Sequence, residues 1–226
     1  SNVTIVGNTA ESSSGGISIG DSSAPILTNT VLWNNFPREI SFSPYDDPSS
    51  IEINYCDVQG GQDSIATNNN GTFTWEEGNI NVDPMFVDTA NGDYHLLADS
   101  RLIDAGHPDS TDADGTIADM GAYYYDQAGQ PTRVTDLIST PTASSIDLTW
   151  SLNSAASAYN IYRSTDAATD FYSAPPLATS SSNAYSDLTA DANNTYYYRI
   201  GAVDSESDEG LLAFKEHGRI GPDSTS

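Results

Sequence analysis

One stretch of the chain has the residue types and the spacing of a cation site. Four carboxylates recur through it, at Asp109, Asp112, Asp114 and Asp119, with Gly115 among them. Hard cations such as Ca²⁺ take carboxylate and backbone oxygens, and alternate aspartates before a glycine can wrap such an ion. The stretch is not an EF-hand loop, because Ser110 takes the first position and Gly121 stands where the bidentate glutamate belongs. These four aspartates are candidate ligands of a structural Ca²⁺. We call the stretch that carries them, residues 109–119, the Asp-rich loop. A solvated, ion-free turn is the alternative.

Other residues with chemical potential are isolated along the chain. His95 and His107 have no partner at the spacing of a metal site. Cys56 is the only cysteine, which excludes an intrachain disulfide and favours a small buried apolar role. Trp33 and Trp75 are candidates for stacking on sugar rings, and packing in a core or a turn is the alternative for both.

The charge balance excludes several classes of partner. The 226 residues carry 32 Asp and Glu against 7 Lys and Arg, a formal charge of −25. Phosphate contacts need clustered Lys and Arg, so we expect no nucleic-acid partner. An anionic lipid surface needs a polybasic face, and a bilayer span needs about 18 apolar residues in a row. Neither occurs in the sequence, so we expect no membrane insertion.

A change in composition divides the chain near residue 130. Asn and Gly punctuate short apolar runs before it, whereas Ser, Thr, Ala and Tyr dominate after it. The polar segment 126–131 contains Gly129 and Pro131 and is the natural joint. We therefore predict one domain over residues 1–126, a second over 131–218, and a polar tail over 219–226.

The first half contains a loose internal repeat. Residues 2–8 (NVTIVGN) are echoed by 29–35 (NTVLWNN) and by 54–60 (NYCDVQG), with further short apolar runs between them. Several short strands in a repeat of about 25 residues are typical of one coil of a parallel β-solenoid. Asn beside the strands suits the turns, because it tolerates left-handed backbone and its amides can bond along a stack. A jelly roll or sandwich with coincidental spacing is the alternative.

An ordered set of motifs follows this repeat. It comprises residues 55–61 (YCDVQGG), 78–87 (GNINVDPMFV), 92–97 (GDYHLL), 102–106 (LIDAG) and 119–123 (DMGAY). With this closing segment, residues 1–125 resemble the C-terminal end of a right-handed parallel β-helix of the pectate-lyase-like class. The closest likeness is to secreted bacterial repeat proteins. The resemblance implies terminal coils of a β-helix and a secreted, cell-surface location.

The second half alternates apolar and polar residues in short runs. Ile146, Leu148 and Trp150 share one face of a predicted strand, and 159–163 and 196–202 alternate likewise. This half resembles a fibronectin type III module, an antiparallel β-sandwich. The resemblance implies that 131–137 is its first strand and that Trp150 is its buried tryptophan. It also implies a corner that begins near Leu188, in which the Tyr196 hydroxyl bonds back to the chain.

The β-helix resemblance raises the question of polysaccharide lyase or hydrolase activity. Uronate lyases need a Lys or Arg base, and the first half has no lysine and only two arginines, Arg38 and Arg101. We therefore predict no enzyme but a non-catalytic structural or adhesive component at the cell surface. It would associate head-to-tail into an extracellular filament, or with another cell-surface protein. The alternatives are the C-terminal fragment of a larger polysaccharide-degrading enzyme, with its active site upstream, and a polysaccharide-binding module.

Overall fold

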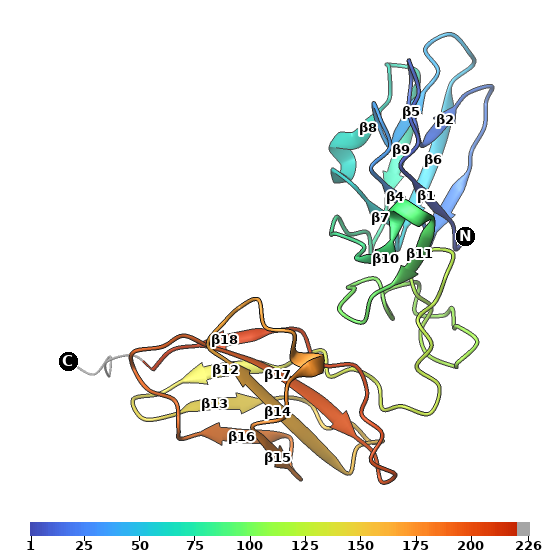
Figure 1. Cartoon of the computed structure of the whole chain (residues 1–226). Helices are drawn as coiled ribbons and strands as arrows, with labels where there is room; N and C mark the ends of the chain where they lie inside the picture. Colours follow the sequence, from blue (N-terminus) through green and yellow to red (C-terminus); the bar gives the residue numbers. More distant parts are fainter. Residues whose placement is uncertain (221–226) are drawn as a thin grey trace. The chain divides into compact units, whose positions relative to one another are not determined.

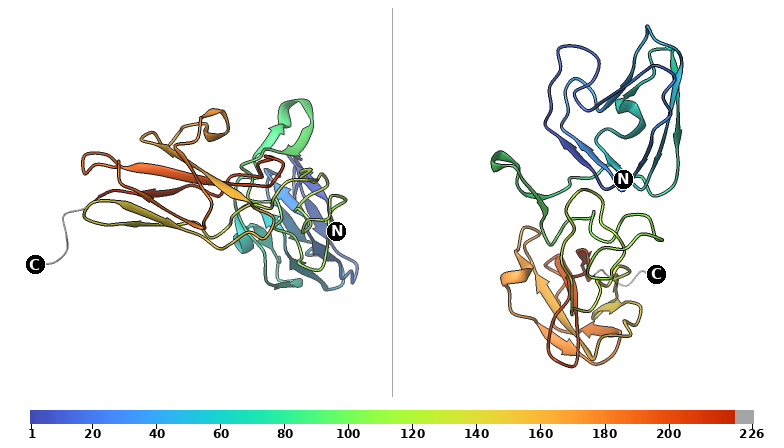
Figure 2. Two further views of the ribbon diagram at one scale, coloured as in Figure 1. Left: turned by 90° about the horizontal axis from the view of Figure 1, so that it is seen from below. Right: turned by 90° about the vertical axis from the view of Figure 1, so that its right-hand side faces the viewer.

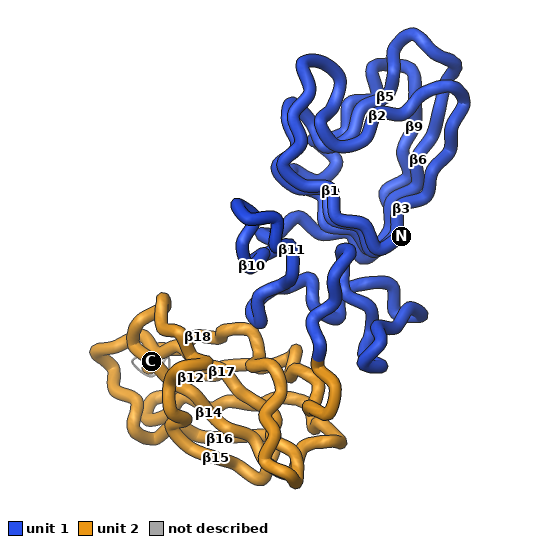
Figure 3. Tube along the Cα trace, turned by 45° about the vertical axis from the view of Figure 1, so that its right-hand side comes forward, with its two compact units in different colours: residues 1–126 blue, residues 127–226 orange. Residues whose placement is uncertain are grey.

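The structure, a computed structural model, describes residues 1–220, and its regular secondary structure is β-strand apart from short 3₁₀ turns (Figure 1). It divides into two compact units, Ser1–Asp126 and Gln127–Ser226, called unit 1 and unit 2 below (Figure 3). Most of the predicted polar tail, 221–226, lies outside the described residues. No helix within residues 1–220 is both long enough and apolar enough to cross a bilayer.

Nine short strands of unit 1 form three parallel sheets. The strands are β1 (Thr4–Val6), β2 (Ile17–Ile19), β3 (Ile26–Thr28), β4 (Val31–Trp33), β5 (Ile40–Phe42), β6 (Ser49–Asn54), β7 (Asp57–Val58), β8 (Ile65–Ala66) and β9 (Gly71–Trp75). The sheet orders are β1-β4-β7, β2-β5-β8 and β3-β6-β9, so each strand pairs with the one three places later. The first repeat is thus β1–β3, the second β4–β6 and the third β7–β9. Successive repeats follow the same course in space (Figure 2, right).

The pairing register stacks apolar residues of the three repeats into inward columns. The columns are Ile5–Leu32–Val58, Ile17–Ile40–Ile65 and Leu27–Ile53–Trp75. Because side chains alternate across a strand, one buried position per strand suffices to build each column. These residues form a single core cluster, in which Leu32, Ile40 and Ile53 of the second repeat have 0% exposure.

Asparagines occupy the corners between the strands, as the sequence predicted. Asn29 and Asn34 have left-handed backbone, with φ of 50° and 57°. Asn29 Nδ2 donates to Asn2 Oδ1 at 3.2 Å, and Asn8 Nδ2 donates to Asn35 Oδ1 at 3.0 Å. Each pair joins the first repeat to the second, so the amides bond along the stack.

After the third repeat the chain leaves the stack and returns along its side. Ile80 bridges to Asp57, and an antiparallel hairpin of β10 (Phe86–Asp88) and β11 (Asp93–Leu96) follows. Short 3₁₀ turns lie at Gly61–Ser64 and Thr89–Asn91. The rest of the closing segment then reaches the second and first repeats, where Gly121 N donates to Asn29 O at 2.8 Å and Ala122 N to Thr4 Oγ1 at 3.0 Å. The closing segment therefore covers part of the outer face of the β1-β4-β7 sheet.

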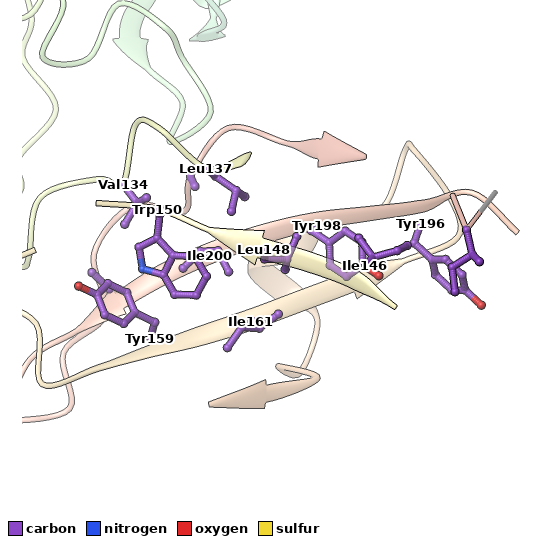
Figure 4. Close-up of a cluster of buried hydrophobic side chains, with 13 residues drawn as sticks. Val134, Leu137, Ile146, Leu148, Trp150, Tyr159, Ile161, Tyr196, Tyr198 and Ile200 are labelled. Carbon is purple, nitrogen blue, oxygen red and sulfur yellow. The ribbon is translucent and has the colours of Figure 1, made fainter. Parts of the chain in front are cut away.

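Unit 2 is a sandwich of two antiparallel sheets with orders β12-β13-β16 and β15-β14-β17-β18. Its strands are β12 (Ile138–Pro141), β13 (Ile146–Thr149), β14 (Ala158–Ser164), β15 (Ala178–Ser180), β16 (Ala184–Asp187), β17 (Tyr196–Val203) and β18 (Glu216–Gly218), with a 3₁₀ turn at Phe171–Ser173. Ile146, Leu148 and Trp150 all face the core, so their predicted alternation is confirmed (Figure 4). Trp150 meets Tyr159 edge-on, with ring centroids 5.2 Å apart.

Two details of the predicted sandwich are corrected. Residues 131–137 form no strand, and β12 begins only at Ile138. Val134 and Leu137 are both buried although they lie three residues apart, which the two-residue period of a strand does not allow. Leu188 is 73% exposed and contributes nothing to the core. The predicted tie of Tyr196 is present, since its hydroxyl donates to Asp191 Oδ2 at 3.1 Å.

Candidate functional site

The Asp-rich loop uses its carboxylates to hold its own backbone. Asp112 Oδ2 accepts from Asp119 N at 2.8 Å, and Asp114 Oδ1 accepts from Thr116 N at 3.0 Å. The two oxygens of Asp119 accept from Asp104 N and Tyr125 N, both at 2.7 Å. Asp119 is 2% exposed, and this burial raises the pKa of its carboxyl to about 7 against the effect of the two amides. Asp119 thus organises the closing segment from inside.

The four predicted calcium ligands are not gathered at one point. Asp109 is exposed, and its backbone amide donates to His107 Nδ1 at 3.2 Å. Among the described residues, no group of three or more His, Cys, Asp and Glu side chains is arranged to hold a metal ion. Calcium at the Asp-rich loop stays a prediction.

Calorimetric titration of Ca²⁺ tests that prediction directly. A structural site predicts a saturable heat for the wild-type chain that the Asp112→Ala/Asp114→Ala variant loses. The exposed pair Asp46 and Asp47, changed to alanine together, is the matched control and keeps the heat. Equal, weak heats for all three chains would leave only the ion-free turn.

Cys56 and the two histidines of unit 1 each contact residues of their own unit. Cys56 is fully buried, and Thr30 N donates to its Sγ at 3.4 Å. Burial raises the pKa of the Cys56 thiol to about 11, so the nucleophilic thiolate is scarce at neutral pH. His95 Nδ1 lies 2.8 Å from Asp93 Oδ1, two residues away on β11, and the His107 ring packs edge-on against Tyr55. None of these pairings aligns a base with a nucleophile.

Asp57 is a buried carboxylate that the sequence did not single out. It has 0% exposure, and its Oδ1 accepts from Val82 N at 3.0 Å. Its Oδ2 is buried with no hydrogen-bond partner among the described residues. Burial, with smaller contributions from nearby Asp83 and Glu39, raises the pKa of Asp57 to about 7 against the effect of the hydrogen bond from Val82. Asp57 lies in β7 at an outward position, which the alternation alone assigns to solvent. No sequence signal marks its burial, because residues more than 20 positions further along the chain, Ile80 and Val82, lie against it.

A cleft opens on the other outward column of the same sheet. It has a volume of about 660 Å³ and lies between the ends of β1 and β4 and the β10–β11 hairpin. Trp33, Phe86 and Tyr94 contribute aromatic rings to its wall, and Asn34, Gln59 and Asp83 contribute polar groups. We call it the aromatic cleft. Trp33 thus lines this cleft, whereas Trp75 packs against the core cluster.

The free edges of β1, β2 and β3 form a second surface, called the first-repeat face below. Each of these strands has a neighbour on one side only. Ile5, Ile17 and Leu27 are only partly buried there, whereas the residues they pair with in the second repeat have 0% exposure. This face therefore combines unpaired strand edges with an incompletely covered core.

Comparisons with known proteins find partial likenesses among solved structures. No protein-family model and no curated protein matches the chain. An Fn3-like protein from Clostridium thermocellum is 25% identical, with 41% of this chain and 92% of that one covered and a TM-score of 0.33. The sixth fibronectin type III domain of human fibronectin type III domain containing protein 3 is 14% identical over 43% of this chain and 92% of that one, with a TM-score of 0.35. A β-1,2-glucanase from Parabacteroides distasonis is 23% identical over 48% of this chain and 15% of that one, with a TM-score of 0.36.

Proposed function

We propose that this chain is a non-catalytic structural component of a secreted, cell-surface assembly. In this proposal unit 1 is a three-coil stretch of right-handed parallel β-helix, and unit 2 is a fibronectin type III spacer. The first-repeat face is the assembly surface. The absence of catalysis in this proposal is supported by the scarcity of cations in unit 1 and by the contacts of Cys56, His95 and His107 described above, none of which pairs a base with a nucleophile.

The first-repeat face carries the proposal. Ile17 N donates to Glu39 O and Ile19 O accepts from Ser43 N, so both residues bond toward the second repeat. Because alternate residues of a strand direct their backbone groups to opposite sides, Ser18 between them directs its N–H to the open side. An edge of this kind is a template for another strand, and the partly exposed column of Ile5, Ile17 and Leu27 adds an apolar reason to pair.

A second copy of this chain is the occupant that fits best. The third repeat ends on β8 and β9, each of which also pairs on one side only, so the two ends of the stack present matching strand edges. Residues 1–28 contain only two charged side chains, Glu11 and Asp21, in a chain of net charge −25. The first-repeat face is thus the part of unit 1 that an acidic partner approaches with least repulsion. Contact between unlike ends does not close on itself and extends head-to-tail.

Sedimentation velocity over a concentration series tests this association. At physiological salt we expect species that grow beyond a dimer as the concentration rises. Ser18→Pro removes the edge N–H donor without touching the bonds of Ile17 and Ile19, and it is expected to reduce association at least tenfold. Ser18→Ala keeps the donor and serves as the matched control. A wild-type chain that stays monomeric at high concentration contradicts the proposal, as does equal association of the two variants.

The second candidate is the C-terminal part of a larger polysaccharide-degrading protein, with unit 2 as its spacer. The same observation favours it, since preceding coils of one polypeptide would cover the first-repeat face equally well. The coding sequence upstream of Ser1 discriminates between the two. Many further coils with Asp, Arg and His clustered on one face would favour the enzyme.

A further inference from the structure

The outer face of the β1-β4-β7 sheet carries two columns of side chains, of which one is buried and the other is partly exposed. Thr4, Val31 and Asp57 form the first column, and the closing segment buries it so that Val31 and Asp57 have 0% exposure. Val6 and Trp33 pair in register in the second column, and Gln59 follows them in the third repeat, where its N donates to Leu32 O at 3.0 Å. The closing segment leaves this second column partly exposed. It is the floor of the aromatic cleft.

The β10–β11 hairpin builds the opposite wall of the cleft. Phe86 and Tyr94 lie edge-to-face with ring centroids 5.4 Å apart, so each fixes the orientation of the other. The hairpin is itself tied down at its base, where Leu97 N donates to Met85 O at 2.9 Å. Rings from two separate elements, Trp33 on the sheet and Tyr94 on the hairpin, therefore contribute to one preformed space.

The polar side chains of the cleft are the amides of Asn34 and Gln59, the hydroxyl of Thr89 and the carboxylate of Asp83. Gln59 Oε1 accepts from Asn34 N at 2.6 Å, which fixes the Gln59 amide and leaves its Nε2 donors without an acceptor among the described residues. Asp83 Oδ1 accepts from Met85 N at 2.9 Å, which leaves its second oxygen for another donor. No Lys, Arg or His is among the residues that line the cleft within the described chain. The cleft thus offers donors and acceptors but no positive charge.

We propose that the aromatic cleft binds a neutral oligosaccharide. Sugar rings have apolar C–H faces that pack on aromatic rings and hydroxyl groups that both donate and accept, which matches Trp33 and Tyr94 with Gln59 and Asp83. A pocket of about 660 Å³ with rings and a few convergent polar groups has the size and character of a small-ligand site. Uronate or sulfated chains do not fit, because the cleft holds a carboxylate and the whole chain carries −25. A basic peptide would need several open carboxylates, and the cleft has only Asp83.

Calorimetry and affinity electrophoresis with defined glycans test the site. The probes are cellohexaose, xylohexaose, mannohexaose and laminarihexaose, with polygalacturonate and oligolysine as charged competitors. We expect at least one neutral hexasaccharide to bind, and Trp33→Ala and Tyr94→Ala each to weaken it at least tenfold. Tyr45→Ala is the matched control, because Tyr45 is 93% exposed in the same unit and does not line the cleft. Its affinity is expected to equal that of the wild type.

Hydrogen exchange of the wild-type chain with saturating hexasaccharide keeps the test independent of any variant that fails to fold. Slower exchange in residues 6–8, 33–35 and 83–97 supports the site, and slowing only elsewhere overturns it. The proposal is also overturned if no neutral hexasaccharide binds, if the cleft variants bind as the wild type does, or if polygalacturonate or oligolysine is preferred.

Discussion

Replacement of Asp187 by alanine is expected to destabilise unit 2 by about 3–5 kcal/mol, because it leaves a paired cation without its partner in a largely buried network. Asp187 has 0% exposure and accepts four hydrogen bonds. Arg163 Nη1 donates at 2.7 Å and the Tyr198 hydroxyl at 2.6 Å, while Thr189 donates from its N and its Oγ1. Equilibrium unfolding by urea in a Trp33→Phe/Trp75→Phe background, in which Trp150 is the remaining tryptophan, measures the loss by its fluorescence.

The same network determines how the stability of unit 2 responds to acid. Burial alone would raise the pKa of Asp187, but the hydrogen bonds from Tyr198, Thr189 and Arg163 outweigh it and lower the pKa. A lowered pKa in the folded state contributes stability above the unfolded value, and this contribution is lost as the pH falls through the folded value. Asp136→Ala is the matched control, because Asp136 is an exposed carboxylate of the same unit that bonds to Ser151. Similar small losses for both variants would contradict the role assigned to Asp187.

Unit 1 is expected to show the opposite response and to lose stability as the pH rises from 5 to 8. Burial raises the pKa of Asp57 and of Asp119 to about 7 in the folded chain. The folded state then binds more protons than the unfolded state between pH 4 and 7, so its advantage is full at low pH and disappears as the carboxyls ionise. A shift of this size corresponds to about 2–3 kcal/mol for each carboxyl between pH 5 and 8.

Urea unfolding in a Trp150→Phe background isolates unit 1, because the remaining tryptophans, Trp33 and Trp75, both belong to it. Asp57→Asn is expected to raise the stability of unit 1 at pH 8 and to remove about half of the pH dependence. Asp63→Asn changes an exposed carboxyl of the same repeat and should leave the pH dependence unchanged. A free energy of unfolding that is flat or rises between pH 5 and 8 would show that these two carboxyls are not buried as described.

The parts of the fold that follow from local rules could be predicted from the sequence. The two-residue period of Ile146, Leu148 and Trp150 identified a sandwich face, and the recurrent Asn residues identified the corners between repeats, because left-handed backbone is a local preference. The strand predicted over 131–137 failed because Val134 and Leu137 are buried at a spacing of three, which reflects tertiary packing rather than strand periodicity.

The sites were harder to predict from the sequence, because they depend on contacts between distant segments. Asp57 and Trp33 both occupy outward positions of one sheet, and nothing in their local sequence says that one is covered and the other borders a cleft. The closing segment and the β10–β11 hairpin make that difference, at a distance of more than 20 residues along the chain. The carboxylates of the Asp-rich loop could be counted from the sequence, but their use as acceptors for backbone amides could not.

Association through the first-repeat face is tested most directly by hydrogen exchange at two protein concentrations. Peptides that contain β1, β2 and β3 report on the free strand edges, and peptides that contain β17 in the interior of the unit 2 sheet serve as the internal reference. We predict that exchange in residues 4–6, 17–19 and 26–28 slows as the concentration rises, while exchange in 196–203 stays unchanged. Equal exchange of the first-repeat strands at both concentrations, in a sample shown to associate, would place the contact elsewhere and contradict the account.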